Sequence, residues 1–244
     1  MFDPKLAPAA AIRAALFDVD GTLVDTNDLH AVAWQEAFRH FDHDVSLAAI
    51  REQIGKGGDN LIPSLLGEIS DDRRDTIDDF RGTLFKQQYL ARAVPFPGVR
   101  DLFERLVADD VKIVLASSAG GEEVAYHLSL IGCEDLVFAT TSRDDAESSK
   151  PCPDIFAAAL GKIAPLGADQ AVVIGDTPWD AIAATRAGVR MIGVRSGGFS
   201  DESLTGAGAI ALFDGPRDLL ARYADSPFAA SVSPSVRAGA DVEA

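Results

Sequence analysis

Hydrophobic residues are spaced in two alternating ways along the second half of the chain. Short apolar runs, typical of buried strands, are separated by segments in which apolar residues recur every three or four positions, typical of helices. The expected strands are residues 111–116, 136–140, 171–174, 191–194 and 209–213. The expected helices are residues 99–109, 122–131, 153–163, 177–187 and 216–223. This alternation predicts an α/β fold with a doubly wound, mostly parallel sheet that helices cover on both faces.

The first hundred residues follow a different pattern. Residues 13–17 are a short apolar run that ends near a Gly turn, which predicts one more buried strand. From residue 27 to residue 94 only helical periodicity occurs, with Ser46 as the expected N-cap of one helix. The helices expected there are residues 27–41, 46–54, 59–66 and 71–93.

These patterns divide the chain into three parts. The Pro95-Phe96-Pro97-Gly98 stretch interrupts the helical region, and strand and helix patterns alternate after it. We therefore expect an α/β core from residues 1–26 and 95–225, and an inserted helical cap from residues 27–94. Residues 226–244 are rich in Ser, Ala, Pro and Gly, which predicts a flexible tail.

Charge and cysteine content narrow the classes of partner. The 244 residues carry a formal net charge of −16, whereas nucleic-acid backbones and anionic membranes are bound by clustered Lys and Arg. An anionic small substrate stays compatible with this charge if its site holds a metal and a lysine. Cys133 and Cys152 lack the spacing of metal ligands, and no signal-peptide core or 18-residue apolar run occurs. We expect a cytoplasmic protein. The sequence does not indicate its oligomeric state.

Two carboxylates follow the first expected strand. Asp18 and Asp20 stand one residue apart, and the break at Gly21 lets the second carboxylate turn towards the same point as the first. Two uncompensated carboxylates at a strand end are costly unless a cation or a proton lies between them. The alternative is a solvated acidic turn, because Asp-Gly is a common turn pair.

Other polar residues lie just after or shortly downstream of expected strands, at the same edge of the sheet. They are Ser117, Lys150 and Asp176. Asp18, Asp176 and a backbone carbonyl would form an all-oxygen cage suited to Mg²⁺. The Pro151-Cys152-Pro153 segment fixes the direction of the preceding lysine ammonium. This set suits phosphoryl transfer, with Asp18 as the nucleophile and Asp20 as the general acid and base.

The same residues resemble the four motifs of the haloacid dehalogenase-like superfamily. These are Asp18-Val19-Asp20-Gly21-Thr22, Ser117 after an apolar strand, Lys150-Pro151-Cys152-Pro153 and Gly175-Asp176-Thr177-Pro178-Trp179-Asp180, in this order over about residues 12–195. The helical insert after the first motif is similar to that of the phosphoglycolate phosphatase and β-phosphoglucomutase branch.

The resemblance implies a role for each motif residue. Asp18 would be nucleophile and metal ligand, Asp20 acid/base and ligand through its carbonyl, and Asp176 a Mg²⁺ ligand. Thr22, Ser117 and Lys150 would hold the phosphoryl group. Asp180 would orient Lys150 or a metal-bound water, or would only stabilise the first turn of its helix. The carboxylate of Asp20 argues against dehalogenase activity, because the dehalogenase branch lacks a carboxylate at this position.

The cap is expected to select the substrate. His30, on the first cap helix, resembles a histidine that lies near the site in both mutases and phosphatases, or is a partly exposed helix residue. Lys56, in a Gly-rich loop, can reach a substrate anion, unless this loop is a simple turn between helices. The mutase branch carries an arginine in this loop for a distal phosphate, and none occurs between Gly55 and Leu66.

The sequence thus predicts a Mg²⁺-dependent phosphatase. It would hydrolyse a small phosphomonoester, of phosphoglycolate or sugar phosphate type, through an aspartyl-phosphate. A β-phosphoglucomutase-like phosphotransferase is the alternative enzyme, and a phosphate-binding module without catalysis is the alternative class. The residues do not distinguish one phosphate ester from another.

Overall fold

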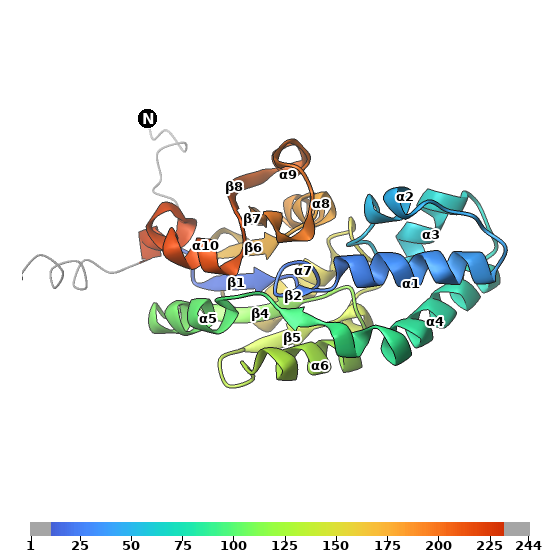
Figure 1. Ribbon diagram of the computed structural model, residues 1–244. Helices are drawn as coiled ribbons and strands as arrows, with labels where there is room; N and C mark the ends of the chain where they lie inside the picture. The colour runs from blue at the N-terminus through green and yellow to red at the C-terminus, as the bar shows by residue number, and fades with distance from the viewer. Residues whose placement is uncertain (1–10, 232–244) are drawn as a thin grey trace, which may run out of the picture.

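Six parallel strands form the central sheet of the computed structural model, which describes residues 11–231 (Figure 1). The strands are β1 (Ala14–Phe17), β4 (Lys112–Ala116), β5 (Ala139–Thr141), β6 (Ala171–Gly175), β7 (Arg190–Val194) and β8 (Ala209–Phe213). Their order in the sheet is β5-β4-β1-β6-β7-β8, and every neighbouring pair is parallel. The predicted α/β fold is confirmed.

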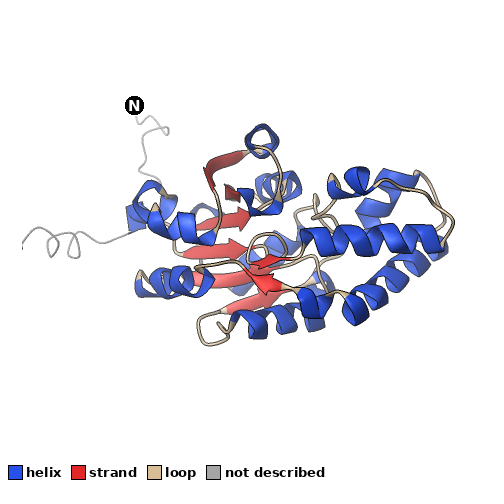
Figure 2. Ribbon diagram, viewed as in Figure 1, coloured by secondary structure: helices blue, strands red, loops and turns tan. Residues whose placement is uncertain are grey.

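Helices cover both faces of this sheet, as Figure 2 shows. They are α5 (Val99–Ala108), α6 (Gly121–Ile131), α7 (Asp154–Lys162), α8 (Pro178–Arg186), α9 (Asp201–Ala207) and α10 (Pro216–Ala221). Successive strand residues point to opposite faces, so β1 contributes Ala15 and Phe17 to a core with α5, α6 and α10. Ala14 and Leu16 join a second core with α7 and α8. Burial on both faces explains why these strands are continuous apolar runs.

The strand order places the site. The chain passes from β1 to β4 and β5 on one side and then to β6, β7 and β8 on the other. In such a sheet, ligands bind beyond the carboxyl ends of the strands where the order reverses, which here is beside β1. Asp18 follows β1, Ser117 follows β4 and Asp176 follows β6. The expected polar residues therefore meet at this edge.

Four helices form a separate layer beside that edge, at the right of Figure 1. We call α1 (Asn27–His40), α2 (Leu47–Arg51), α3 (Gly58–Leu66) and α4 (Asp71–Gln88) the cap helices. They bury their own apolar clusters, one around Trp34 and Phe38 and one around Phe85. Ser46 accepts a hydrogen bond from the Ala49 N–H at 3.2 Å, so the predicted N-cap is confirmed. These separate clusters support our proposal that residues 27–94 are an inserted domain.

The cap helices leave and rejoin the core at one place. β2 (Val24–Asp25) and β3 (Val94–Pro95) form an antiparallel pair, in which Val24 lies opposite Pro95. The sequence analysis did not predict this pair, because two-residue strands give no periodic signal. It also missed α9, a helix of seven residues whose N-cap is Ser200.

The C-terminal segment differs from its prediction. The flexible tail was expected to start at Ser226, but Pro227–Ser231 forms a 3₁₀ helix. Phe228 is fully buried and stacks on Tyr223 with a ring-centroid distance of 5.6 Å. Ordered chain thus continues to residue 231, because an aromatic side chain fills the core there. The rest of the predicted tail, residues 232–244, lies outside the described residues. Within residues 11–231, no helix has the length and apolar character needed to cross a membrane.

Candidate active site

A buried lysine joins two carboxylates at the reversal point of the sheet. Lys150 Nζ donates a 2.6 Å hydrogen bond to Asp18 Oδ1 and lies 2.7 Å from Asp180 Oδ1. Lys150 is only 1% exposed, and its side chain comes from the segment before α7. Asp180 also accepts hydrogen bonds from the Thr177 N–H and hydroxyl at 3.1 and 2.5 Å, which caps α8. Asp180 thus contacts the lysine and also caps its helix, and its role in orienting the lysine stays a prediction.

Asp176 lies beside this pair and is held by polar and backbone contacts. Thr22 Oγ1 donates to Asp176 Oδ1 at 2.8 Å, and Asn27 Nδ2 donates to Asp176 Oδ2 at 2.8 Å. The Thr22 hydroxyl, expected to face a phosphoryl group, is thus engaged with Asp176. A Cβ at Gly197 would fall 1.7 Å from Asp176 Oδ2, so only glycine allows this close approach of the chain.

Three carboxylates and one ammonium leave the site short of positive charge. Oxygens of Asp18, Asp176 and Asp180 all lie within 4.8 Å of one another, and the only cationic side chain paired with them among residues 11–231 is Lys150. Burial, with Asp180 nearby, raises the pKa of Asp176 from 3.8 to about 7. Burial likewise raises the pKa of Asp18, despite Lys150. One divalent cation would balance the two excess negative charges, and an all-oxygen donor set suits Mg²⁺.

This electrostatic imbalance predicts a pH-dependent effect of Mg²⁺ on stability. Between about pH 4 and about pH 7 the folded protein keeps a proton on Asp176 that the unfolded chain has lost, so the free energy of unfolding falls as pH rises. A cation that replaces this proton restores stability above the folded pKa. We expect Mg²⁺ to raise the unfolding temperature more at pH 8 than at pH 5, measured by calorimetry. An equal rise at both pH values, or the same rise in Asp176→Asn, would contradict this assignment.

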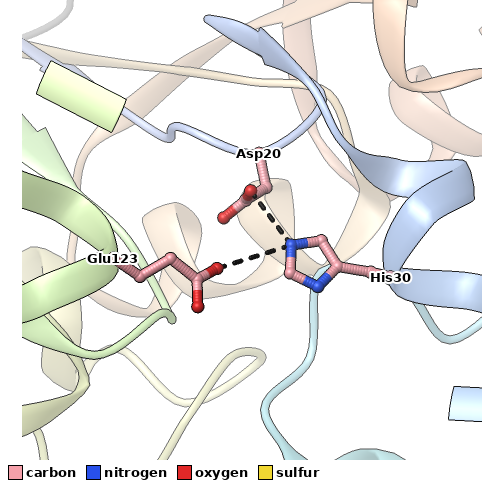
Figure 3. A group of neighbouring side chains, drawn as sticks. All are labelled: Asp20, His30 and Glu123. Atoms are coloured by element: carbon pink, nitrogen blue, oxygen red, sulfur yellow. Dashed lines mark hydrogen bonds and ion pairs between the residues drawn. The ribbon is translucent and has the colours of Figure 1, made fainter. Parts of the chain in front are cut away.

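Asp20 forms its side-chain contacts with residues at the start of the cap. Its Oδ1 accepts a 2.6 Å hydrogen bond from Thr26 Oγ1 and lies 3.1 Å from His30 Nε2, as Figure 3 shows for the histidine. His30 stacks on Phe85 with ring centroids 3.9 Å apart. Burial alone would raise the pKa of Asp20, but His30 and Thr26 outweigh it and lower this pKa below its usual range. The cap histidine expected near the site does contact Asp20.

The Gly-rich loop before α3 packs directly on the core. Lys56 Nζ lies 3.9 Å from the centroid of the Trp179 ring and donates to Gln53 Oε1 at 2.6 Å and to Ser64 Oγ at 3.0 Å. A Cβ at Gly55 would fall 2.7 Å from the Thr177 side chain. The loop therefore contacts the helix that carries Asp180, and the cap lies against the core.

A second contact of the cap reaches the residue before Lys150. Ser149 Oγ accepts from the Gly57 N–H at 3.0 Å and donates to Asp59, and the Ser149 N–H donates to Asp59 Oδ2 at 3.0 Å. Asn60 Nδ2 donates to the Ser149 carbonyl at 3.0 Å. Three cap groups thus bind the backbone and the hydroxyl of the residue before the buried lysine.

A cavity of about 410 Å³ lies between the cap helices and the core. Asp18, Asp20 and Lys150 line it from the core, and Lys56 lines it from the cap. Its size suits a small ligand, which the cap would enclose. All four residues were predicted to belong to one site, and the structure brings them together.

The two serines after β4 differ in their hydrogen bonds. Ser117, the predicted phosphate ligand, is buried, and its Oγ accepts a 3.0 Å hydrogen bond from the Ala119 N–H. Ser118 lines the cavity, and its Oγ is buried without a hydrogen-bond partner among the described residues. Ser118 thus offers a free hydroxyl that the sequence analysis did not identify.

This arrangement has counterparts among known proteins. The family model described as haloacid dehalogenase-like hydrolase matches residues 15–194, which include every motif residue. The chain belongs to this family. The resemblance found from the four motifs is thereby confirmed, and the matched segment of this hydrolase includes both the core strands β1 to β7 and the cap helices.

Its relatives place this hydrolase among the phosphatases of the family. A phosphoglycolate phosphatase of Rhodospirillum rubrum is 29% identical over 215 residues, covering 83% of this chain and 87% of that protein. Pyrophosphatase PpaX of Bacillus pumilus is 28% identical over 188 residues, covering 76% of this chain and 84% of that protein. The crystal structure of a hydrolase from Pseudomonas syringae is 30% identical with a TM-score of 0.82, covering 88% of this chain and 98% of that one.

Several contacting residues lay outside the predicted set. Thr26 and Asn27 follow the first motif directly, so their position in the chain could have indicated them. Glu123 and His127 lie on α6 and reach the site only through the fold. Their one sequence signal is a spacing of four residues, which places both on one helix face.

Proposed function

We propose that the protein is a Mg²⁺-dependent phosphatase that hydrolyses a small phosphomonoester through an aspartyl-phosphate. The observation that carries this proposal is the Lys150 ammonium 2.6 Å from Asp18, with Asp176 beside them in the same buried group. A carboxylate next to a fixed ammonium and a further carboxylate suits phosphoryl transfer, in which positioning and charge neutralisation dominate.

Asp18 acts as the nucleophile in this mechanism. Lys150 donates to one of its carboxylate oxygens, which leaves the other to attack phosphorus as the ester oxygen leaves on the opposite side. Lys150 also lies close enough to neutralise charge on the transferred group. The free hydroxyl of Ser118 and the nearby Ser117 are donors for its oxygens.

Asp20 acts as the general acid and the general base of the reaction. It protonates the departing oxygen in the first half of the reaction and takes a proton from water in the second. Thr26 and His30 stabilise its carboxylate form, which suits the second half. The negative charge of a bound phosphate ester favours the proton that Asp20 needs in the first half.

The metal would be held by Asp18, Asp176 and the backbone carbonyl of Asp20. When bound, Mg²⁺ would neutralise the phosphate oxygens and the carboxylates around it. Thr22 and Asn27 position Asp176 for this contact.

The substrate carries its phosphate at the core and its remaining part under the cap. Lys56 is a cation of the cap that lines the cavity, and its described hydrogen bonds go to neutral groups. It can bind an anionic or hydroxyl-rich leaving group, as in phosphoglycolate or a sugar phosphate. Pyrophosphate, the substrate class in the name of one relative, also presents a second anion.

Lys56→Met is expected to raise KM about tenfold while kcat changes less than about twofold, because one charge-assisted hydrogen bond to substrate is lost away from phosphorus. Steady-state phosphate release measures both constants. Lys162→Met, at a half-exposed lysine paired with Asp145, is the matched control. A fall in kcat with an unchanged KM would contradict substrate binding by Lys56.

Phosphate release from a panel of phosphomonoesters and pyrophosphate, with and without Mg²⁺, tests the proposed function. Metal-dependent release, with one compound favoured by kcat/KM, is the expected result. The absence of release from every compound would refute hydrolysis.

A β-phosphoglucomutase-like phosphotransferase is the second candidate, favoured by the position of Lys56 across the cavity from Lys150. The loop lacks the arginine of that branch, which favours hydrolysis. Glucose 1-phosphate with a trace of the bisphosphate separates the two, since a mutase forms glucose 6-phosphate with little free phosphate.

A further inference from the structure

A second group of side chains that can ligate a metal surrounds Asp20. His30 Nε2 lies 3.1 Å from Asp20 Oδ1 and 3.6 Å from Glu123 Oε1 (Figure 3). His127 Nδ1 lies 3.9 Å from the same Asp20 oxygen. His30 comes from cap helix α1, whereas Glu123 and His127 come from α6 of the core.

Two of these side chains are buried without the partners they need. Glu123 is 6% exposed, and its Oε1 has no hydrogen bond among the described residues. His127 is completely buried, and neither ring nitrogen has a hydrogen-bond partner in the same part of the chain. Buried polar groups normally have hydrogen-bond partners, because an unpartnered one loses its hydration without compensation. Glu123 Oε1 faces His30 and His127 Nδ1 faces Asp20, so the missing partner of these two atoms belongs beside Asp20 and His30.

Geometry and charge indicate a cation as that partner. In a tetrahedral site with bonds of about 2.0–2.1 Å, ligand atoms lie about 3.3 Å apart, and the 3.1 and 3.6 Å separations among Asp20, His30 and Glu123 are close to this value. His127 Nδ1, 3.9 Å from Asp20 Oδ1, would complete the set after a shift towards the ion. Two carboxylates and two neutral imidazoles would balance one divalent cation. Glu123 and His127 are four residues apart on one helix, a spacing that directs two ligands to the same side.

The donor types distinguish this group from the Mg²⁺ cage. The ligands proposed for Mg²⁺, the Asp18 and Asp176 carboxylates and the Asp20 carbonyl, offer only oxygen. The second group adds imidazole nitrogen, which suits Zn²⁺ and similar transition metals. Phe85, stacked on His30, forms an apolar wall on the cap side. We propose that Asp20, His30, Glu123 and His127 form an inhibitory site for Zn²⁺ or a related divalent transition metal.

Binding there has two consequences, the first of which rests on the proposed function. The cation would occupy the carboxylate that moves protons, so hydrolysis would stop even with Mg²⁺ in place. It would also join the cap to the core, because His30 belongs to the cap and the other three ligands belong to the core. Inhibition would therefore trap the enclosed form of the cavity.

Co²⁺ absorption provides a test independent of activity. With Mg²⁺ in excess to fill the oxygen cage, Co²⁺ added to the wild type should give the intense visible bands of a four-coordinate site, and Zn²⁺ should displace it. Glu123→Gln and His127→Gln should each weaken Co²⁺ affinity by at least about tenfold. Glu122→Gln, at an exposed neighbour paired with Lys86, should leave it unchanged.

Phosphatase assays complete the test. Zn²⁺ should inhibit the wild type and Glu122→Gln alike, non-competitively with Mg²⁺, and should inhibit Glu123→Gln at least about tenfold less. The proposal is overturned by weak octahedral Co²⁺ bands, by unchanged affinity in both ligand variants whose folded state circular dichroism has verified, or by relief of inhibition with excess Mg²⁺. An enzyme without phosphatase activity that still gives the Co²⁺ bands would refute the proposed function and leave the site standing.

Discussion

Asp18→Asn should lower phosphate release by about 10⁴-fold or more, because an amide cannot attack phosphorus and loss of a nucleophile has effects of this order. The change keeps the shape of the side chain and removes one charge from a buried group that has an excess of negative charge. The variant is therefore expected to fold and to retain phosphate ester binding. Single-turnover assays should detect labelled phosphate on the wild-type protein and none on the variant.

A matched control uses Asp28→Asn, a mostly exposed aspartate on α1 whose carboxylate pairs with Arg51. Its activity should stay close to that of the wild type. Retention of more than about a hundredth of the activity by Asp18→Asn would rule out the aspartyl-phosphate.

Lys150→Met should destabilise the protein by about 3–5 kcal/mol and remove its activity. Breaking a buried ion pair leaves uncompensated charge, here on both Asp18 and Asp180. Without the ammonium both carboxylates favour protonation in the folded state, so the loss of stability in metal-free buffer should be larger at pH 8 than at pH 5. Urea unfolding at the two pH values measures the effect.

The double variant Lys150→Met/Asp180→Asn distinguishes charge from packing. Removal of one of the two stranded carboxylates should restore part of the stability and none of the activity. Stability as low as in the single variant would indicate that the lost contact of the lysine with Phe156, whose ring centroid lies 5.5 Å from Nζ, dominates. Lys162→Met, at the protein surface, should change stability by less than about 0.5 kcal/mol.

The sequence predicted the core because its strands are buried on both faces. A short run in which every position is apolar, such as residues 171–174, indicates a strand buried on both faces. The alternation of such runs with helices then implies a parallel sheet. Periodicity cannot detect β2 and β3, which have two residues each. The prediction of a flexible tail was wrong at Phe228, because the burial of this residue depends on core side chains from distant segments.

The site residues that directly follow a strand could be predicted from the sequence. Asp18 and Asp176 could be assigned to one edge because parallel strands end together. Thr22 shows the limit of that argument: its hydroxyl donates to Asp176, a contact that the sequence did not indicate, and its contact with phosphate stays a prediction. Glu123 and His127 could not be assigned to the site from their four-residue spacing alone, since nothing in α6 indicates that a cap histidine will pack opposite them.

The antiparallel pair β2–β3 has a consequence for how such proteins diversify. Because Val24 and Pro95 are paired neighbours, the core meets the intervening segment as a loop whose two ends are already fixed together. Lengthening or exchanging that segment leaves its two attachment points to the core in place, and loop length itself adds little entropic cost. Proteins that descend from one ancestral gene can thus acquire new specificities by substitutions in the roughly 70 residues between this pair. The catalytic residues of the core need not change.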